Sequence, residues 1–232
     1  MKELPKSDIY EQEFEYMPWG ILIDKILTII QEEAAQDGTV LDLMCGPGYL
    51  LGEIEKRRND LFLEGIDISE KFINFAQNKY SKISFQVVNA LLWNPTKKYD
   101  IILCTGGIHH LPYDEQAPFI RKIPAALNPN GFVIFADPYI DDYSNELARK
   151  QAAAKLGYEY MIATIKNGAN DDIIKATVDI LYNDVMGFEY KTSIKKLKPI
   201  FKKLFPQLEI KKTWPESESE YGDYYIIGKR VF

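Results

Sequence analysis

Short apolar runs alternate with amphipathic stretches through the first 138 residues of the chain. The runs are nearly continuous, as in strands that are buried on both faces of a sheet. Between them apolar residues recur every three to four positions, which predicts helices. This alternation predicts a doubly wound, mostly parallel α/β sheet with helices on both faces. The predicted strands span residues 39–44, 61–66, 83–88, 99–104 and 131–136, and the predicted helices span 18–35, 49–58 and 69–80.

The alternation stops after Pro138, where the pattern becomes helical only. We therefore expect a helical cap inserted over the sheet after its fifth strand. Proline should also limit two other segments: Pro118 and Pro124 are expected to interrupt residues 114–127, and Pro199 to interrupt the last helix or mark its start. The predicted cap helices span 144–156, 158–166 and 171–186, with Gly157, Gly168 and Gly187 as their C-caps.

The last forty residues predict one more helix and a hairpin. Residues 193–205 are amphipathic and rich in lysine, which favours a helix that covers the sheet with its lysines in solvent. Residues 208–213 and 224–229 read as strands, and we expect them to pair antiparallel at the sheet edge. We interpret residues 1–232 as one domain made of an N-terminal lid and helix (1–37), a cofactor-binding core (38–138), the cap (139–192), and a closing helix with edge strands (193–232).

Charge and cysteine content narrow the function classes. The formal charge of −6 and pI of about 5.1 argue against binding to nucleic acid or to anionic membranes, and favour a small-molecule partner. Cys45 and Cys104 are too few for a disulfide framework or a Cys-rich metal site, so we expect no metal and a reducing, cytoplasmic location. No signal peptide or membrane-spanning run is evident. We expect a monomer or a homodimer.

The sequence VLDLMCGPG, residues 40–48, ends the first predicted strand in a glycine turn. Gly46 and Gly48 lack Cβ atoms, so a ligand can lie against the turn, and the following helix presents unpaired backbone N–H groups. Asp42 would repel a pyrophosphate but attract an amino-acid ammonium group. A nicotinamide dinucleotide is further disfavoured because Leu51 stands where the motif G-x-G-x-x-G needs its third glycine. The turn therefore favours a cationic ligand.

A second acid, Asp67, ends the second predicted strand within the sequence GIDIS. A carboxylate at this position of a doubly wound sheet can accept both hydroxyls of a ribose. Asn89 and Ala90 end the third strand, where side-chain and backbone groups can meet an adenine edge. Ile68 and Leu91 can supply apolar walls for the base. These positions predict an adenosine-containing ligand.

Together these segments resemble the class I S-adenosylmethionine-dependent methyltransferases, which have a Rossmann-like fold. The resemblance rests on the order and spacing of VLDLMCGPG, GIDIS, VVNALLW, YDIILCTGGIHHL and LNPNGFVIFADP, and covers residues 38–138. Asn89 departs from the acid that is common in the family, and Asn130 departs from a glycine. The resemblance implies S-adenosyl-L-methionine as cofactor and S-adenosyl-L-homocysteine as product. The cofactor-binding residues that it implies are Asp42, Met44, Gly46, Gly48, Asp67, Ile68, Asn89, Ala90, Leu91, Cys104 and Thr105.

Candidate catalytic residues follow the fourth and fifth predicted strands. Methyl transfer from a sulfonium depends mainly on alignment, and needs a base only where the nucleophile arrives protonated. His109 and His110 are the two histidines of the chain, and either could be this base or could merely orient the loop. Tyr16 is a further catalytic candidate. Asp137 either touches the substrate or fixes the chain at Pro138.

Aromatic residues gather before the first predicted helix and after the fifth predicted strand. Tyr10, Trp19, Tyr139 and Tyr143 are the predicted substrate-binding residues. Their ring faces can hold a sulfonium or an amine by cation–π attraction, or can pack the N-terminal helix onto the core. The predicted function is methyl transfer to an O or N atom of a small molecule. The alternatives are another S-adenosylmethionine reaction, such as an intramolecular displacement or cyclisation, and a non-catalytic cofactor-binding protein.

Overall fold

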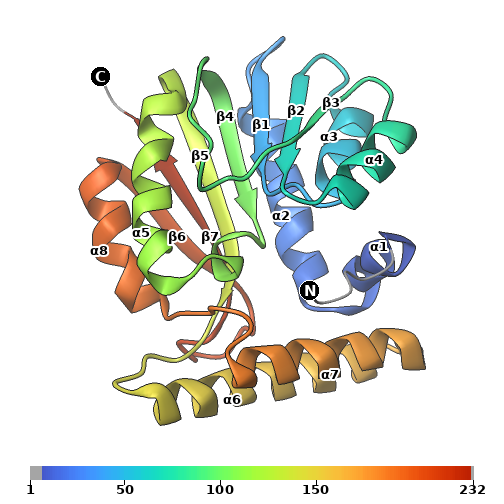
Figure 1. Cartoon of the computed structure of the whole chain (residues 1–232), viewed down its shortest axis with the longest axis vertical. Helices are drawn as coiled ribbons and strands as arrows, with labels where there is room; N and C mark the ends of the chain where they lie inside the picture. Colours follow the sequence, from blue (N-terminus) through green and yellow to red (C-terminus); the bar gives the residue numbers. More distant parts are fainter. Residues whose placement is uncertain (1–6, 231–232) are drawn as a thin grey trace.

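The computed structural model describes the backbone of residues 7–230 and the side chains of residues 12–230. The strands in this part of the chain are β1 (Thr39–Leu43), β2 (Phe62–Asp67), β3 (Ser84–Val87), β4 (Tyr99–Thr105), β5 (Leu127–Tyr139), β6 (Gln207–Trp214) and β7 (Gly222–Lys229). They form one sheet in the order β3-β2-β1-β4-β5-β7-β6 (Figure 1). Strands β1 to β5 are parallel, whereas β7 pairs antiparallel with β5 and with β6. The predicted Rossmann-like sheet with an antiparallel edge hairpin is confirmed.

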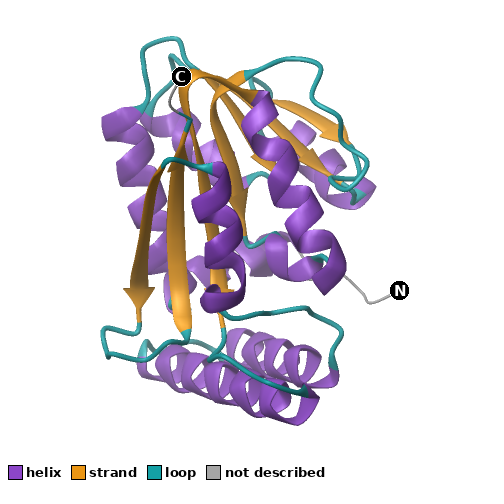
Figure 2. Ribbon diagram, turned by 90° about the vertical axis from the view of Figure 1, so that its left-hand side faces the viewer, coloured by secondary structure: helices purple, strands orange, loops and turns teal. Residues whose placement is uncertain are grey.

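Helices cover both faces of the sheet (Figure 2). They are α2 (Trp19–Glu33), α3 (Tyr49–Arg57), α4 (Glu70–Lys79), α5 (Tyr113–Lys122) and α8 (Ile194–Leu204). Helices α2, α3 and α4 bury their apolar stripes against one face, where Leu22 and Leu51 join one core cluster. Helices α5 and α8 cover the other face, with Phe119 and Phe201 in a second cluster. The apolar spacing seen in the sequence is therefore the stripe that each helix buries.

Two long helices, α6 (Glu146–Lys166) and α7 (Asp171–Met186), lie side by side across one end of the sheet (Figures 1 and 2). Asn145 and Asn170 are their N-cap residues, and the side-chain oxygen of each accepts a hydrogen bond from a backbone N–H of the first turn. Arg149 is buried and joins the two helices by donating to the Asp184 carbonyl over 2.7 Å. This helical cap covers the carboxyl ends of the parallel strands, the edge where ligands of such sheets bind.

One predicted helix end in the cap is wrong. Helix α6 runs through Gly157, where the sequence predicted a C-cap. A Cβ at Gly157 would lie 2.8 Å from Leu181 Cδ1, so the glycine is there because α6 and α7 pack closely at this point. Gly187 does end α7 in the left-handed conformation, with a φ of 79°.

Two prolines also lie inside helices. Helix α5 continues through Pro118, and α8 begins at Ile194 and continues through Pro199. The predicted interruption at Pro118 is therefore wrong, and so is the prediction that Pro199 interrupts the last helix or marks its start. Pro124 lies in the 3-10 turn η2 (Ile123–Ala126), which directly follows α5. Each proline removes one helical hydrogen bond, but both helices bury a full apolar stripe against the sheet, and this packing sustains them.

The N-terminal segment forms a helix that the sequence did not predict, α1 (Ser7–Tyr16). Phe14 stacks on Tyr49 with ring centroids 4.3 Å apart, and Asn167 at the end of α6 donates to the Tyr16 carbonyl over 2.7 Å. Helix α1 therefore bridges the start of α3 and the cap. None of the helices in the described residues combines the length and apolar character needed to cross a bilayer.

Candidate active site

Two neighbouring cavities lie at the carboxyl ends of β1 and β4, next to the cap. The larger has a volume of about 950 Å³, and its wall includes parts of α1, α6, α7 and the 3-10 turn η1 (Ile108–His110). The smaller has a volume of about 20 Å³ and lies beside the glycine turn after β1. Phe14 and Trp19 line both cavities, so aromatic side chains separate them. The order of the sheet reverses between β1 and β4, and this is the usual ligand position in doubly wound sheets.

The smaller cavity contains buried polar atoms without partners. Asp42 is 2% exposed, and within the described residues neither its Oδ1 nor the Thr105 hydroxyl has a hydrogen-bond partner. Burial raises the pKa of Asp42 to about 8, and the charge of Asp67 adds to the shift. An unpaired buried carboxylate is costly, so the site suits a ligand that brings a positive group and hydrogen-bond donors. These residues fit the ammonium group expected beside Asp42.

The turn after β1 has an unusual backbone conformation. Met44 has a φ of 61° and Gly48 a φ of 82°, both left-handed, and for Met44 this conformation is strained. The Gly46 N–H donates to Asp67 Oδ2 over 2.9 Å, and the Ser69 N–H donates to Asp67 Oδ1 over 2.8 Å. Asp67 thus ties the turn to the end of β2. Each carboxylate oxygen keeps a further lone pair that can accept a ribose hydroxyl.

The residues predicted to surround adenine are not part of the wall of either cavity. Ile68 is 65% exposed at the end of β2, and Ala90 is buried. Asn89 accepts the Leu91 N–H with its side-chain oxygen over 2.9 Å, which forms a local turn. Cys104 is fully buried in the core and lines neither cavity.

His109 and Asp137 form a hydrogen-bonded pair beside the larger cavity, which His109 lines. Nδ1 of His109 lies 2.5 Å from Asp137 Oδ1, and the Ile108 N–H donates to Asp137 Oδ2 over 2.8 Å. Burial raises the pKa of Asp137, which is 1% exposed, to about 7. When Nδ1–H donates to Asp137, Nε2 becomes the proton-accepting nitrogen of the ring. Asp137 thus holds η1 and His109 in place, a contact that neither of its two predicted roles named.

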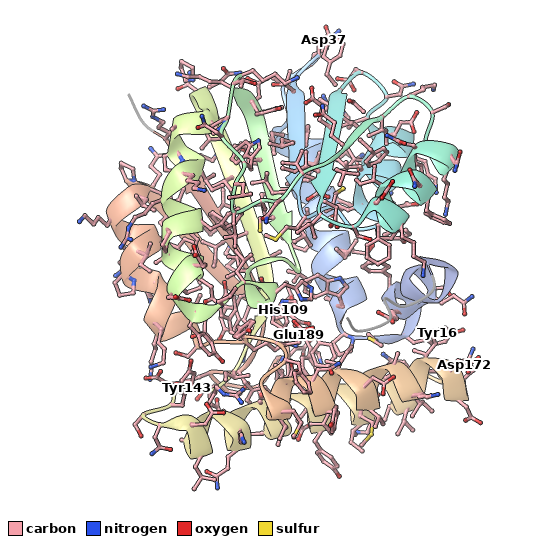
Figure 3. The ribbon with its side chains drawn as sticks, in the orientation of Figure 1. Tyr16, Asp37, His109, Tyr143, Asp172 and Glu189 are labelled. Carbon is pink, nitrogen blue, oxygen red and sulfur yellow. The ribbon has the colours of Figure 1, made fainter. Side chains whose placement is uncertain are left out.

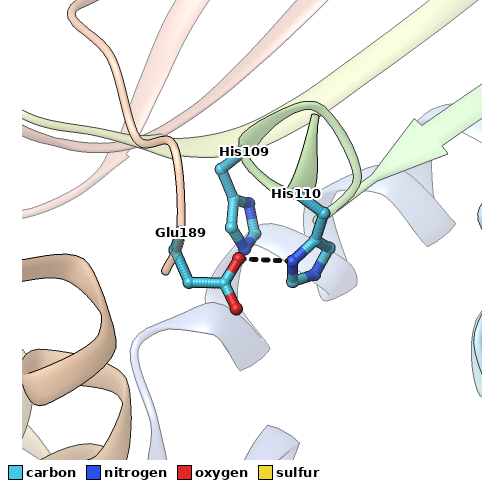
Figure 4. Close-up of side chains that lie close together, drawn as sticks. All are labelled: His109, His110 and Glu189. Carbon is cyan, nitrogen blue, oxygen red and sulfur yellow. Dashed lines mark hydrogen bonds and ion pairs between the residues drawn. The ribbon is translucent and has the colours of Figure 1, made fainter. Parts of the chain in front are cut away.

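His110 contacts a carboxylate from the segment that follows α7 (Figure 4). Its Nδ1 lies 2.6 Å from Glu189 Oε2. Burial opposes ionisation of Glu189, but the hydrogen bond and charge of His110 outweigh it and lower the pKa of Glu189 to about 2. The Tyr190 N–H donates to the His109 carbonyl over 2.7 Å, which holds this segment against η1. Glu189 is therefore ionised and fixed in the cavity wall.

The composition of this cluster would also suit a metal ion. One ligand atom from each of His109, His110 and Glu189 lies within 4.8 Å of the others. Two ligands of one ion are separated by about 3 Å, given metal–ligand bonds of about 2.1 Å. The His110 and Glu189 atoms approach to 2.6 Å, and His109 Nδ1 is bonded to Asp137. These distances fit a directly hydrogen-bonded cluster better than a shared ion, and the absence of a metal stays a prediction.

The family described as "Methyltransferase domain" matches residues 40–131, from β1 into β5. Among curated relatives, the uncharacterized methyltransferase YdaC of Bacillus subtilis (strain 168) is 26% identical over 150 residues, 63% of this chain and 78% of that protein. Residues 40–131 therefore form a class I S-adenosylmethionine-dependent methyltransferase domain. The chain is an enzyme that uses S-adenosylmethionine.

Other proteins similar to this methyltransferase differ in the reactions that their names state. The carboxy-S-adenosyl-L-methionine synthase of Campylobacter concisus (strain 13826) is 30% identical over 120 residues, 50% of this chain and 50% of that protein, so the chain spans half the length of this relative. In fold, the chain resembles the plantazolicin methyltransferase BpumL, solved in complex with SAH, with a TM-score of 0.67 and 12% identity over 97% of this chain and 88% of that one. That likeness concerns the fold alone.

The aromatic candidates of the methyltransferase separate into two groups. Trp19 lines both cavities. Tyr139 is 1% exposed and packs in the core, and Tyr143 hydrogen-bonds Thr192 beside α6 (Figure 3). Neither of them lines the larger cavity, and nor does Tyr16. The side chain of Tyr10 lies outside the described residues.

Sequence reasoning missed four acidic residues of the larger cavity. Glu13 comes from α1, Asp179 and Asp184 come from α7, and Glu189 comes from the segment after α7. None belongs to a motif, and 79 positions separate Glu189 from its partner His110. The chain offers no local signal for such a pairing, because only the placement of the cap on the sheet brings these residues together.

Proposed function

We propose that this enzyme transfers a methyl group to an N or O atom of a small molecule that binds in the larger cavity, with His109 as the general base. The observation that carries the proposal is the pair of His109 and Asp137 in a cavity of about 950 Å³ that shares Phe14 and Trp19 with the Asp42 cleft. This volume suits a drug-sized ligand. The reacting atom would lie between the two cavities.

Asp42 and Thr105 would bind the amino-acid end of the cofactor. When bound, S-adenosylmethionine supplies an electrophilic methyl group on a sulfonium. The unpaired Oδ1 of Asp42 and the unpaired Thr105 hydroxyl can accept from its ammonium group, while Asp67 accepts from the ribose. A space of about 20 Å³ is too small for this ligand. We therefore expect α1, which places Phe14 over the cleft, to move as a lid when the cofactor enters.

His109 would remove a proton from the acceptor. Asp137 holds Nδ1, which orients the ring and stabilises the imidazolium that forms when Nε2 takes a proton. Trp19 and the cap would exclude water and fix the acceptor in line with the methyl group. His110 is 54% exposed and bonded to Glu189, so we assign it a structural role in the wall.

The second candidate function is a different reaction on the same cofactor. It is supported by the similarity to the carboxy-S-adenosyl-L-methionine synthase of Campylobacter concisus, whose name states a reaction other than methyl transfer. A carboxylate-bearing co-substrate would need a cationic residue in the cavity. Lys191 lines it, but both oxygens of Asp184 bind the Lys191 ammonium, at 2.7 and 2.8 Å. This pairing favours methyl transfer over a reaction with an anion.

The proposal is tested by incubating the purified enzyme with S-adenosylmethionine and a small-molecule extract, and by analysing the nucleoside products by mass spectrometry. Acceptor-dependent formation of S-adenosylhomocysteine is expected, and the mass of the acceptor should rise by one methyl group. Formation of methylthioadenosine or of a carboxylated cofactor would instead support the second candidate. Tight binding of S-adenosylhomocysteine without any turnover would favour a non-catalytic protein.

The net charge of −6 supports a small-molecule acceptor rather than nucleic acid. The presence of two cysteines alone, Cys45 and Cys104, supports a reducing, cytoplasmic location. We propose a single domain in which the cap and the N-terminal segment close over the acceptor, in a monomer or homodimer.

A further inference from the structure

Two hydrogen-bonded pairs of titratable side chains form part of the wall of the larger cavity. Both oxygens of Asp184 bind the Lys191 ammonium, at 2.7 and 2.8 Å. Nδ1 of His110 lies 2.6 Å from Glu189 Oε2 (Figure 4). A charged ligand at these positions would have to displace a partner that is already bound, and would gain little from the exchange. These pairs therefore complete their part of the wall without a ligand.

Two further acids contribute little charge to the interior of the cavity. Burial raises the pKa of Glu13 to about 7, so a large share of this carboxyl is protonated at neutral pH. Asp179 is exposed, and solvent screens its charge. The charge of the described wall therefore selects neither an anion nor a cation, and the apolar side chains decide what binds.

Apolar side chains line the cavity from the cofactor cleft outward. Trp19 lies at the boundary with that cleft, and its ring packs at the end of β4, where a Cβ on Gly106 would approach it to 3.1 Å. In the wall formed by the cap, Leu156 from α6 is buried and Ile180 from α7 is partly buried. The wall beside the cofactor cleft thus continues into an apolar interior.

Two aromatic rings form the rim, where the cavity opens to solvent. Tyr182 and Phe188 line the cavity and yet are 56% and 59% exposed. Their ring centroids are 6.2 Å apart, one ring near the end of α7 and the other just after it. A single exposed apolar residue is ordinary, but exposed rings that continue an apolar cavity are typical of a ligand-binding groove. The apolar surface therefore reaches from the cofactor cleft to solvent.

We propose that the methyl acceptor is a neutral amphiphile, with one O–H or N–H group beside His109 and an apolar body that extends to Tyr182 and Phe188. This inference rests on the proposed function and names its substrate class. His109 takes the proton of the reacting group, whose electron pair forms the bond to the methyl carbon while the C–S bond breaks and leaves its pair on sulfur. The products are a neutral methylated acceptor, a neutral thioether and the imidazolium of His109. The acceptor is uncharged before and after the reaction, which suits an apolar cavity.

The inference is tested first with a series of 4-alkylphenols, from 4-methylphenol to 4-heptylphenol. Their affinities for the full chain saturated with S-adenosylhomocysteine are measured by calorimetry. Each added methylene should raise the affinity about threefold to fourfold until the alkyl chain passes the rim, because each buries apolar surface. An affinity that does not depend on chain length, or no binding of 4-butylphenol at millimolar concentration, would overturn the inference.

A matched pair of compounds isolates the effect of charge. 4-Propylphenol and tyramine have equally many heavy atoms, but the chain of tyramine ends in an ammonium group. We expect 4-propylphenol to bind at least about tenfold more tightly, since an ammonium group among apolar side chains loses its hydration without gaining a partner. Equal or tighter binding of tyramine would overturn the inference and leave the proposed methyl transfer intact.

Variants of the rim locate the apolar body of the ligand. Tyr182→Ser and Phe188→Ser should each weaken binding of 4-heptylphenol about fivefold or more, and leave that of 4-ethylphenol within about twofold. Leu147→Ser is the control, because Leu147 is a 68% exposed apolar residue of α6 that does not line the cavity. Unchanged binding of 4-heptylphenol in both rim variants, or an equal loss in the control, would contradict the inference. Failure of S-adenosylhomocysteine to bind would instead refute the proposed function itself.

Discussion

The two cavities of this methyltransferase differ in how their charges are balanced. In the cleft beside the glycine turn, Asp42 and Thr105 leave buried polar atoms without partners, and burial raises the pKa of Asp42 to about 8. In the larger cavity, by contrast, His109, His110 and Lys191 each contact a carboxylate. The first site is incomplete until a ligand arrives, whereas the second is complete and selects its ligand by shape and net charge. Substitutions should therefore act on affinity in the first and on rate and selectivity in the second.

The largest expected effect comes from removing the unpaired charge of the cleft. Asp42→Asn should weaken binding of S-adenosylhomocysteine by roughly 1,000-fold, since loss of one partner of a buried ion pair costs about 3–5 kcal/mol. Calorimetry measures the affinity. Asp114→Asn, an exposed change of the same kind on α5, should leave it unaltered. Less than a tenfold loss in Asp42→Asn would show that Asp42 does not meet the ammonium group.

His109→Gln should lower kcat by about 100-fold or more, the usual contribution of a general base, with the affinity for S-adenosylhomocysteine within about twofold of the original. Steady-state rates with the acceptor found in the extract assay measure the effect. His110→Gln is the matched control and should change kcat much less, because His110 contacts Glu189 rather than Asp137. Equal losses in the two variants would contradict the division of roles between the two histidines.

The ligand-free enzyme should lose stability as the pH rises from about 5 to about 8. Burial raises the pKa of Asp42 to about 8 and that of Asp223 to about 7, whereas unfolded Asp titrates near 4. The folded chain therefore holds protons that the unfolded chain has released, so each such group contributes a fall of at most about 1.4 kcal/mol per pH unit.

Urea unfolding at several pH values measures this slope. Asp42→Asn should flatten the slope, and saturating S-adenosylhomocysteine should do the same in the original chain, because a bound ammonium compensates the carboxylate. Stability that stays level or rises through this window would contradict the raised pKa values. Carboxyls with lowered pKa values, such as Glu189, are already ionised above pH 5 and do not alter the sign.

Phe14→Ala tests the aromatic boundary between the two cavities. Phe14 stacks on Tyr49 at 4.3 Å, so its loss should speed both association and dissociation of S-adenosylhomocysteine by about fivefold, as expected for a stacking energy near 1 kcal/mol. Stopped-flow fluorescence of Trp19 follows both rates. Leu147→Ala, an exposed change on α6, serves as the control. Unchanged rates would mean that α1 is not a lid.

The smallest effect is expected at Tyr143. Its hydroxyl contacts Thr192 at 3.3 Å and its ring lies under Lys196, away from the cavity wall. Tyr143→Phe should therefore leave kcat and KM within about twofold. A large rise in KM would support the prediction from the sequence that Tyr143 binds the substrate. It would also mean that the cap closes around the acceptor in a different arrangement.

The sequence by itself determined the sheet, the glycine turn and the family. The sequence predicts the features whose positions depend on contacts within a few residues or on a fixed place at a strand end. These features are strand β1, Gly46, Gly48 and the acids Asp42 and Asp67. The sequence could not predict that α6 continues through Gly157, because this glycine is required by the close packing of Leu181 from α7.

Only the tertiary structure decided the larger cavity. It brings Glu13, Asp179 and Glu189 from segments far apart in the chain to one wall, and it separates Trp19, which lines the cavity, from Tyr139, which the core buries. The physical reason is that the electrostatic interaction between charged side chains depends on the distance between them, not on their order along the chain. Local pattern fixes where a strand or helix lies, and the packing of the cap on the sheet fixes which side chains meet.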